Sequence, residues 1–103
     1  MWAQLISMRL KAGKEVELPS LYEQLRAAEQ PDTGLLRTIA LRDDNDPRRI
    51  FNIVFFDSEE KARQREQDPR REERLQVARA TMAEIFEGPA EFVDLTVIED
   101  TSY

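Results

Sequence analysis

Apolar residues recur at two different spacings along the chain. In four segments they alternate with other residues or form short runs, which predicts four β-strands over residues 2–10, 35–42, 49–56 and 91–98. Both faces of the first strand are partly apolar, and this pattern favours a sheet that is covered on both sides. The polar segment 43–47 predicts a hairpin loop between the second and third strands.

Helical spacing follows the first strand. Four apolar residues succeed one another at intervals of three or four and share one stripe of a predicted helix: Leu18, Leu21, Leu25 and Ala28. Pro19 is tolerated only in a first turn, so we expect this helix to begin near residue 17 or 18. The turn-forming segment 30–34 is expected to stop it.

A second helical stretch follows the third strand and is broken in the middle. We expect Asp57 to cap its start, with a glutamate three residues later in the capping-box position. Asp68-Pro69 predicts a new start, with the aspartate as N-cap and the proline as first helical residue. Gly88-Pro89 is predicted to end this third helix. Its apolar face holds Leu75, Ala78, Met82, Ile85 and Phe86.

The predicted order is therefore strand, helix, strand, strand, broken helix, strand. This is the β-α-β-β-α-β pattern of the ferredoxin-like α+β fold, in which helices cover one face of a four-stranded antiparallel sheet. A length of 103 residues fits one domain, over residues 1–103.

Both faces of the third strand are apolar. One face carries Phe51, Ile53 and Phe55, and the other carries Ile50, Val54 and Phe56 beside Asn52. We interpret the second set as a face that a lone protomer would not leave in water. The sequence thus predicts a homodimer through the sheet face, with the two sheets joined into an α/β barrel. The alternative is that a loop or the C-terminal tail covers this face.

Composition narrows the chemistry. Without cysteine or histidine, the chain has no disulfide, no thiol nucleophile, no Ser-His-Asp triad and no histidine ligand for haem. A net charge of −6 argues against nucleic acid as a partner. No apolar run is long enough to span a membrane, and the N-terminus lacks the features of a secretory signal, so we expect a cytoplasmic protein.

The charge is unevenly distributed. Residues 61–79 hold seven basic and four acidic side chains, a local net charge of +3. Two interpretations stay open: a solvated helix face with internal ion pairs, or a patch that attracts anions.

Several short segments resemble one known family. They are residues 11–15, residues 34–36, Asp46-Pro47, residues 52–62 and Asp68-Pro69. Together they resemble the dimeric α/β-barrel domains that include the antibiotic biosynthesis monooxygenase family. The resemblance implies the fold deduced above. Its members include cofactor-free oxygenases of aromatic polyketides, haem-degrading enzymes and isomerases.

The family resemblance also bears on haem and cofactor chemistry. Many relatives carry histidine where this chain has Arg65 and Arg70. Haem degradation is therefore not expected, and neither a cofactor nor a metal is predicted.

Five residues are candidates for a site between sheet and helices. Asn52 and Arg37 are the catalytic candidates, because each is polar within a strand and could stabilise a substrate anion. Trp2, Tyr22 and Arg65 are the candidates for binding a small aromatic ligand. The alternative roles are structural: a hydrated asparagine at the dimer seam, an ion-paired strand arginine, packing aromatics and a surface arginine.

Three hypotheses about function follow. The first is a cofactor-independent monooxygenase acting on a small aromatic or quinol-type molecule. The second is a non-catalytic homodimer that binds a small ligand or serves in assembly, which the lack of histidine and cysteine favours. The third is an isomerase or lyase, which would need a base from carboxylates, arginines or Tyr22.

Overall fold

A computed structural model describes all residues, 1–103. Its elements are β1 (Trp2–Leu10), a 3-10 turn (Glu15–Glu17), α1 (Leu18–Ala28), β2 (Leu35–Asp43), β3 (Asp46–Phe56), α2 (Glu59–Glu66), α3 (Pro69–Ile85) and β4 (Phe86–Thr96).

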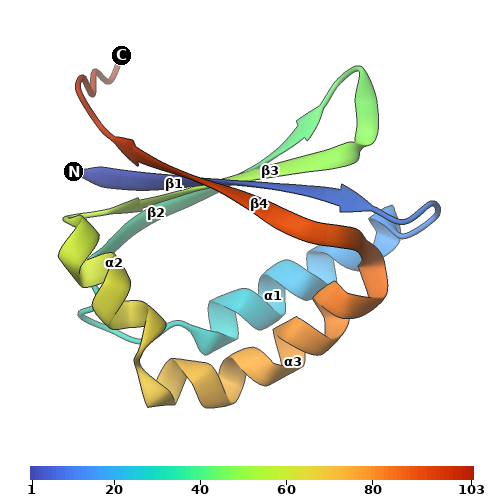
Figure 1. Cartoon of the computed structure of the whole chain (residues 1–103), viewed down its shortest axis with the longest axis horizontal. Coiled ribbons are helices and arrows are strands. Elements are labelled where there is room, and N and C mark those ends of the chain that lie inside the picture. The colour runs from blue at the N-terminus through green and yellow to red at the C-terminus, as the bar shows by residue number, and fades with distance from the viewer.

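The four strands form one sheet in the order β2-β3-β1-β4, and each neighbouring pair is antiparallel. All the helices lie on one side of this sheet, and α1 and α3 lie side by side (Figure 1). The predicted ferredoxin-like α+β architecture is confirmed. No helix is long and apolar enough to cross a membrane.

The predicted end of the third helix is wrong. Helix α3 stops at Ile85, and β4 begins at once with Phe86, which pairs with Leu10 of β1. Gly88 therefore lies within the strand, near the place where the β1–β4 register shifts, and its φ of +72° suits that irregularity. The glycine-proline pair bends a strand and does not end a helix.

The hairpin between β2 and β3 is tighter than predicted, because β3 begins at Asp46. The Asn45 amide donates to Asp43 Oδ1 at 2.8 Å inside the turn. Pro47 is tolerated in the strand because β1 pairs with β3 only from Arg49 onward.

The two helix starts after β3 gave different outcomes. Asp68 is the N-cap of α3, and its carboxylate accepts from the Arg70 amide at 2.9 Å, as predicted. Asp57 is not the cap of α2. Ser58 takes that role, because its backbone is extended and its hydroxyl accepts from the Lys61 amide at 3.2 Å.

The helices cover the face of the sheet that the sequence suggested was open to a partner. Ile50 and Phe56 are only 2% and 3% exposed and belong to the core beneath the helices. The face with Phe51, Ile53 and Phe55 is the one that no helix covers (Figure 1). The prediction that both faces are apolar is confirmed. The assignment of the faces is wrong, because the face with Ile50 and Phe56 lies under the helices and the face with Phe51 is the open one.

The core is divided into two clusters. The larger one joins the inner stripes of α1 and α3 to one end of the sheet: Leu10, Leu18, Leu21, Ala28, Ile50, Leu75, Ala78 and Ile85. The smaller one lies under α2: Trp2, Phe56 and Ala62. On β1 and β3, the helix-facing positions between the clusters are only half-buried, and Asn52 is one of them.

Candidate functional site

Asn52 lies near the middle of the helix-covered face. Across the sheet it pairs with Ile6 of β1 and Ala40 of β2, so these three side chains share one row. Asn52 is half-buried, and Ala40 beside it is exposed. Asn52 therefore faces the helix layer from the inner strand β3.

Tyr22 of α1 reaches down to this row. Its hydroxyl donates to Asn52 Oδ1 at 3.4 Å. Burial raises the pKa of Tyr22, and the hydrogen bond to Asn52 and the charge of Arg42 offset only part of that rise. The structure therefore brings two of the five candidates into contact through a neutral phenol.

Trp2 lies at the other end of the same face. It is 8% exposed, and its ring centroid is 6.0 Å from that of Phe56. The Arg63 guanidinium sits 5.2 Å from the indole centroid and also donates to Asp94 at 2.8 Å. Trp2 is thus packed into the core and covered by a cation held in place by β4.

Arg65 is not a free surface arginine. Its Nε donates to Glu29 at 3.1 Å, its Nη2 contacts the other oxygen of the same carboxylate, and its side chain is 12% exposed. The guanidinium also lies 5.4 Å from the Phe56 ring centroid. The two-pronged ion pair ties α2 to the end of α1.

Arg37 lies on the opposite face from Asn52. It pairs across the sheet with Phe55, is exposed, and has no ion-pair partner. It helps to line an open hollow of about 490 Å³ together with Phe55 and the C-terminal residues Glu99 and Asp100. One site within one protomer cannot contain both Arg37 and Asn52.

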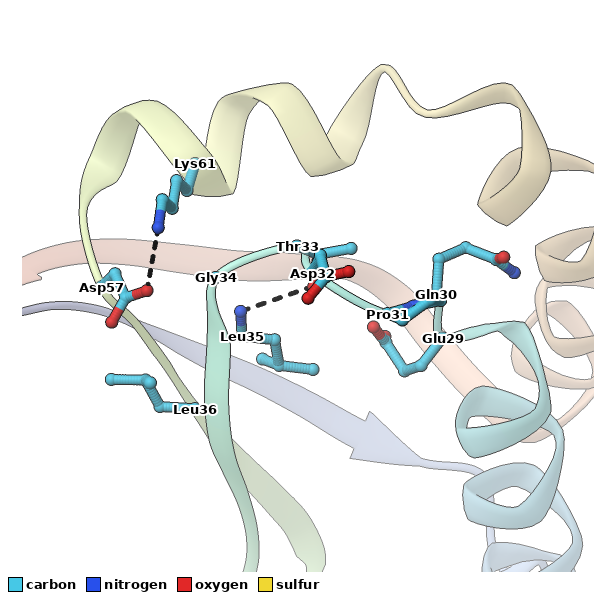
Figure 2. A pocket seen from close by; sticks show the side chains of 10 residues that line it. All are labelled: Glu29, Gln30, Pro31, Asp32, Thr33, Gly34, Leu35, Leu36, Asp57 and Lys61. Carbon is cyan, nitrogen blue, oxygen red and sulfur yellow. Dashed lines mark hydrogen bonds and ion pairs between the residues drawn. The ribbon is translucent and has the colours of Figure 1, made fainter.

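A second hollow, of about 450 Å³, follows the connection from α1 to β2 (Figure 2). Asp57 and Lys61 close one side of it with an ion pair of 3.1 Å. Neither hollow is lined by Asn52 or Tyr22.

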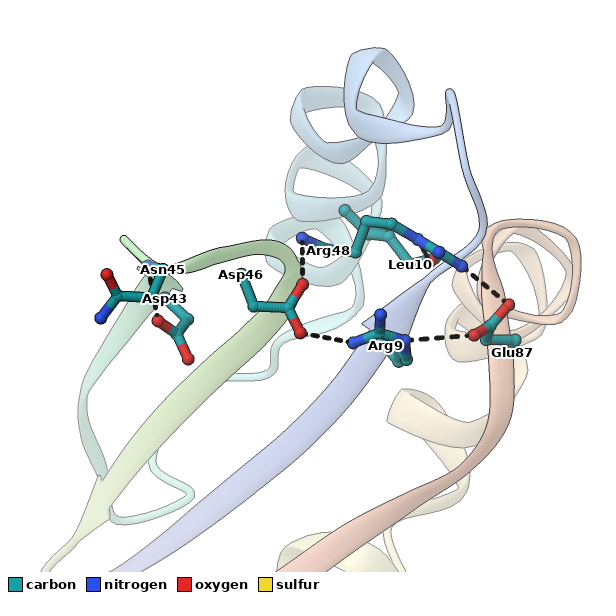
Figure 3. Close-up of polar contacts among 7 residues, drawn as sticks. All are labelled: Arg9, Leu10, Asp43, Asn45, Asp46, Arg48 and Glu87. Atoms are coloured by element: carbon teal, nitrogen blue, oxygen red, sulfur yellow. Dashed lines mark hydrogen bonds and ion pairs between the residues drawn. The ribbon is translucent and has the colours of Figure 1, made fainter.

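Another polar cluster holds the far end of the sheet together (Figure 3). Arg9 of β1 contacts Asp46 at 2.6 Å and Glu87 at 3.3 Å, and Arg48 contacts Glu87 at 3.0 Å. The hydrogen bond from Arg9 holds the pKa of Asp46 below its usual value. These exposed ion pairs join β1, β3 and β4 and have a structural role.

Sequence reasoning missed Arg71. Its side chain is only 14% exposed, its Nε has no hydrogen-bond partner, and its nearest carboxylate oxygen belongs to Glu29 at 4.0 Å. Burial, with the nearby charge of Arg65, lowers the pKa of Arg71. The signal was present, because residue 71 continues the spacing of the apolar stripe through Leu75 and Ala78.

The comparisons with known proteins decide the family. The model of the antibiotic biosynthesis monooxygenase family matches residues 1–73. The chain belongs to the antibiotic biosynthesis monooxygenase family. No curated protein matches the sequence.

Solved structures share the fold of this family member at low identity. A protein of Bordetella bronchiseptica described as an antibiotic biosynthesis monooxygenase superposes with a TM-score of 0.77 at 16% identity, over 95% of this chain and 97% of that one. A variant of SnoaB from Streptomyces nogalater, a cofactor-independent oxygenase, gives 0.71 at 16% identity, over 96% and 94% of the two chains.

A mutant of MhuD, solved with two manganese protoporphyrin IX molecules per active site, gives a TM-score of 0.75 at 19% identity and covers 100% of both chains. At these identities the likeness shows the common fold alone. Proteins with this fold thus include one described as a cofactor-independent oxygenase and one that binds a metalloporphyrin, so the fold does not decide the function of this chain.

Proposed function

We propose that the protein is a cofactor-independent monooxygenase of small aromatic or quinol-type molecules, with its site at Asn52 and Tyr22. The hydrogen bond between these two side chains is the observation that carries the proposal. It puts the polar atoms of β3 and α1 between two apolar clusters, where an aromatic ring has apolar surroundings and a substrate oxygen has a partner. Family membership and the described activity of SnoaB support the same chemistry.

Each side chain has a definite role in this proposal. Asn52 accepts from Tyr22 through Oδ1, so its amide N–H groups are free to donate to a phenolate oxygen of the substrate. Hydrogen bonds to the anion favour the deprotonated substrate. That anion passes one electron to dioxygen, and the resulting radical and superoxide combine into a carbon-bound peroxide. In an anthrone the carbon that reacts is the ring methylene. Loss of water from its peroxide leaves a quinone carbonyl, so one methylene and one dioxygen give one carbonyl and one water.

Oxygen uptake with a panel of anthrones and quinols tests the proposal. We expect enzyme-dependent uptake with wild type and at least a ~10-fold lower rate with Asn52→Ala, since one donor to a developing anion is worth that much or more. Asn45→Ala, in the exposed β2–β3 turn, is the matched control and should keep the wild-type rate. A panel without enzyme-dependent uptake would reject the oxygenase and leave the non-catalytic binding or assembly module.

We further propose that two copies pair through the open sheet face. This face carries Phe51, Ile53 and Phe55 on β3, and on β4 Val93 and Leu95 are 48% and 41% exposed. An apolar patch of this extent is typical of an interface.

Charges on the open face complement one another in a twofold arrangement. Arg37 and Arg49 lie on the β2–β3 half, and Glu91 lies on the β4 half. We assign Arg37 to this interface and not to the oxygenation site. Sedimentation equilibrium at micromolar concentration should give a dimer, and a single monomeric species would refute the pairing.

A further inference from the structure

Arginines occupy inward-facing positions on both helices that follow β3. Arg71 continues the buried stripe of α3 by one step beyond Leu75, and Arg65 follows the buried Ala62 by three positions on α2. Both side chains are more than four-fifths buried, at 14% and 12% exposure. Such positions normally carry apolar side chains, because a buried charge is costly without a partner.

The charges here do not balance. Arg65 takes both oxygens of the Glu29 carboxylate, and Arg71 lies 4.0 Å from one of them, beyond hydrogen-bond distance. Glu72 and Arg79, the other charged groups near Arg71, contact each other. Two buried guanidiniums thus share one carboxylate, and Arg71 Nε keeps an unused donor.

The cluster of Arg65, Arg71 and Glu29 lies on the helix-covered side of the sheet, as does the proposed site at Asn52 and Tyr22. Arg65 lies over Phe56, whose side chain points to the helices from the strand that carries Asn52. Glu29 follows Tyr22 by seven residues, two turns along α1, which separates them by roughly 10 Å at 1.5 Å per residue. This rise along the helix axis is comparable with the length of two or three fused aromatic rings.

We propose that Arg71, together with Arg65, binds a carboxylate carried by the substrate, at the opposite end of the ring system from the oxygen that meets Asn52 and Tyr22. The inference rests on the proposed function, and it narrows the substrate class to fused-ring phenols or quinols with an acidic substituent. Glu29 competes with that substituent for the two guanidiniums and holds them in place when no ligand is bound.

Binding without turnover tests the inference. Anthracene-2-carboxylate and its neutral carboxamide are titrated by fluorescence under anaerobic conditions into wild type, Arg71→Gln, Glu29→Gln and the control Arg26→Gln, whose arginine is exposed on α1. Wild type and the control should bind the carboxylate at least about tenfold more tightly than the carboxamide. Arg71→Gln should lose this preference, and Glu29→Gln should increase it by removing the competing carboxylate.

Equal binding of both probes by wild type would overturn the inference, as would a preference unchanged in Arg71→Gln. If that variant does not fold, Glu29→Gln decides, because a purely structural cluster predicts no gain in carboxylate affinity. The failure of each proposal is distinct. Oxygen uptake without carboxylate preference removes the anion site alone, and carboxylate preference without oxygen uptake removes the oxygenase alone.

Discussion

Asn52 shows how one polar residue in an apolar strand acquires a partner. The nearest side chains in its own row are Ile6 and Ala40, which offer no hydrogen bond. The partner comes from the helix layer, where the Tyr22 hydroxyl lies 3.4 Å from Oδ1. A half-buried amide that depends on one neighbour is well suited to exchange that neighbour for a ligand.

Removing the Tyr22 hydroxyl should affect activity more than stability. Tyr22→Phe removes one long hydrogen bond, which should lower the free energy of unfolding by about 1 kcal/mol. It should reduce oxygen uptake at least ~10-fold, because Asn52 then loses the group that orients it. Urea denaturation and oxygen uptake check the two effects. The control is Tyr103→Phe at the exposed C-terminus, and an equally large loss of activity there would contradict the assignment.

Stability at high pH should also depend on Tyr22. Burial raises the pKa of this phenol above its usual 10.0, so the folded state holds the proton when the unfolded state has lost it. The stabilisation is complete below pH 10.0 and is lost as the pH rises through the folded pKa. Urea denaturation between about pH 8 and 11 should show a difference between wild type and Tyr22→Phe that shrinks toward high pH. A constant difference would contradict this expectation.

At the scale of the element, the start of α2 depends on one residue. Ser58→Ala should lower the free energy of unfolding by about 1 kcal/mol, because it removes the acceptor of the Lys61 amide. Asp57→Ala removes only an exposed ion pair with the Lys61 side chain and should cost less than about 0.5 kcal/mol. Urea denaturation of both variants checks this order, and the reverse order would restore Asp57 as the cap.

The connection from α1 to β2 depends on Gly34. Its φ is +81°, and a Cβ placed there would lie 2.5 Å from Lys61 Cδ and 2.8 Å from Lys61 Cβ on α2. Gly34→Ala should therefore cost about 2 kcal/mol or more, through backbone strain and a clash with the helix.

Gly13 is the matched control for Gly34. It has a φ of +79°, and a Cβ added there would meet no atom within 4 Å, so Gly13→Ala should cost only about 1 kcal/mol. Thermal unfolding measures the stability of both variants. Gly13→Ala introduces backbone strain alone, and Gly34→Ala introduces backbone strain and the contact with Lys61. Equal losses would show that α2 moves aside freely.

At the scale of the whole molecule, the open sheet face sets the expected assembly. Val93 on this face and Val77 on the outer side of α3 are 48% and 59% exposed, so a glutamate at either place is tolerated by the protomer. Val93→Glu should weaken self-association at least ~10-fold, since it puts a charge into the proposed interface. Val77→Glu should leave association unchanged. Sedimentation equilibrium measures both, and a dimer undisturbed by Val93→Glu would exclude this face.

The small protomer core agrees with a missing partner. Only 12 of 103 residues are buried, and the apolar positions of the open face remain half-exposed. A chain of this size buries a limited share of its surface by itself, so a second copy adds apolar burial that the fold lacks.

Local patterns were sufficient to predict the elements and their order. The period-two strands, the stripe from Leu18 to Ala28 and the Asp68-Pro69 helix start all act within a few residues, and all three predictions are confirmed. Where two local signals competed, the sequence misled. Asp57 and Ser58 are both good caps, and Gly88-Pro89 resembles a helix end as much as a strand irregularity.

The sequence by itself determined the α+β architecture and excluded chemistry that needs histidine or cysteine. The tertiary structure decided which apolar face the helices cover, which put Asn52 beside Tyr22 and Arg37 on the other side of the sheet. It also decided that Arg71 is buried beside Arg65 and Glu29. The physical reason is the separation along the sequence. Periodicity depends on residues a few positions apart, whereas a site is formed by residues from α1, β3, α2 and α3 that packing brings together.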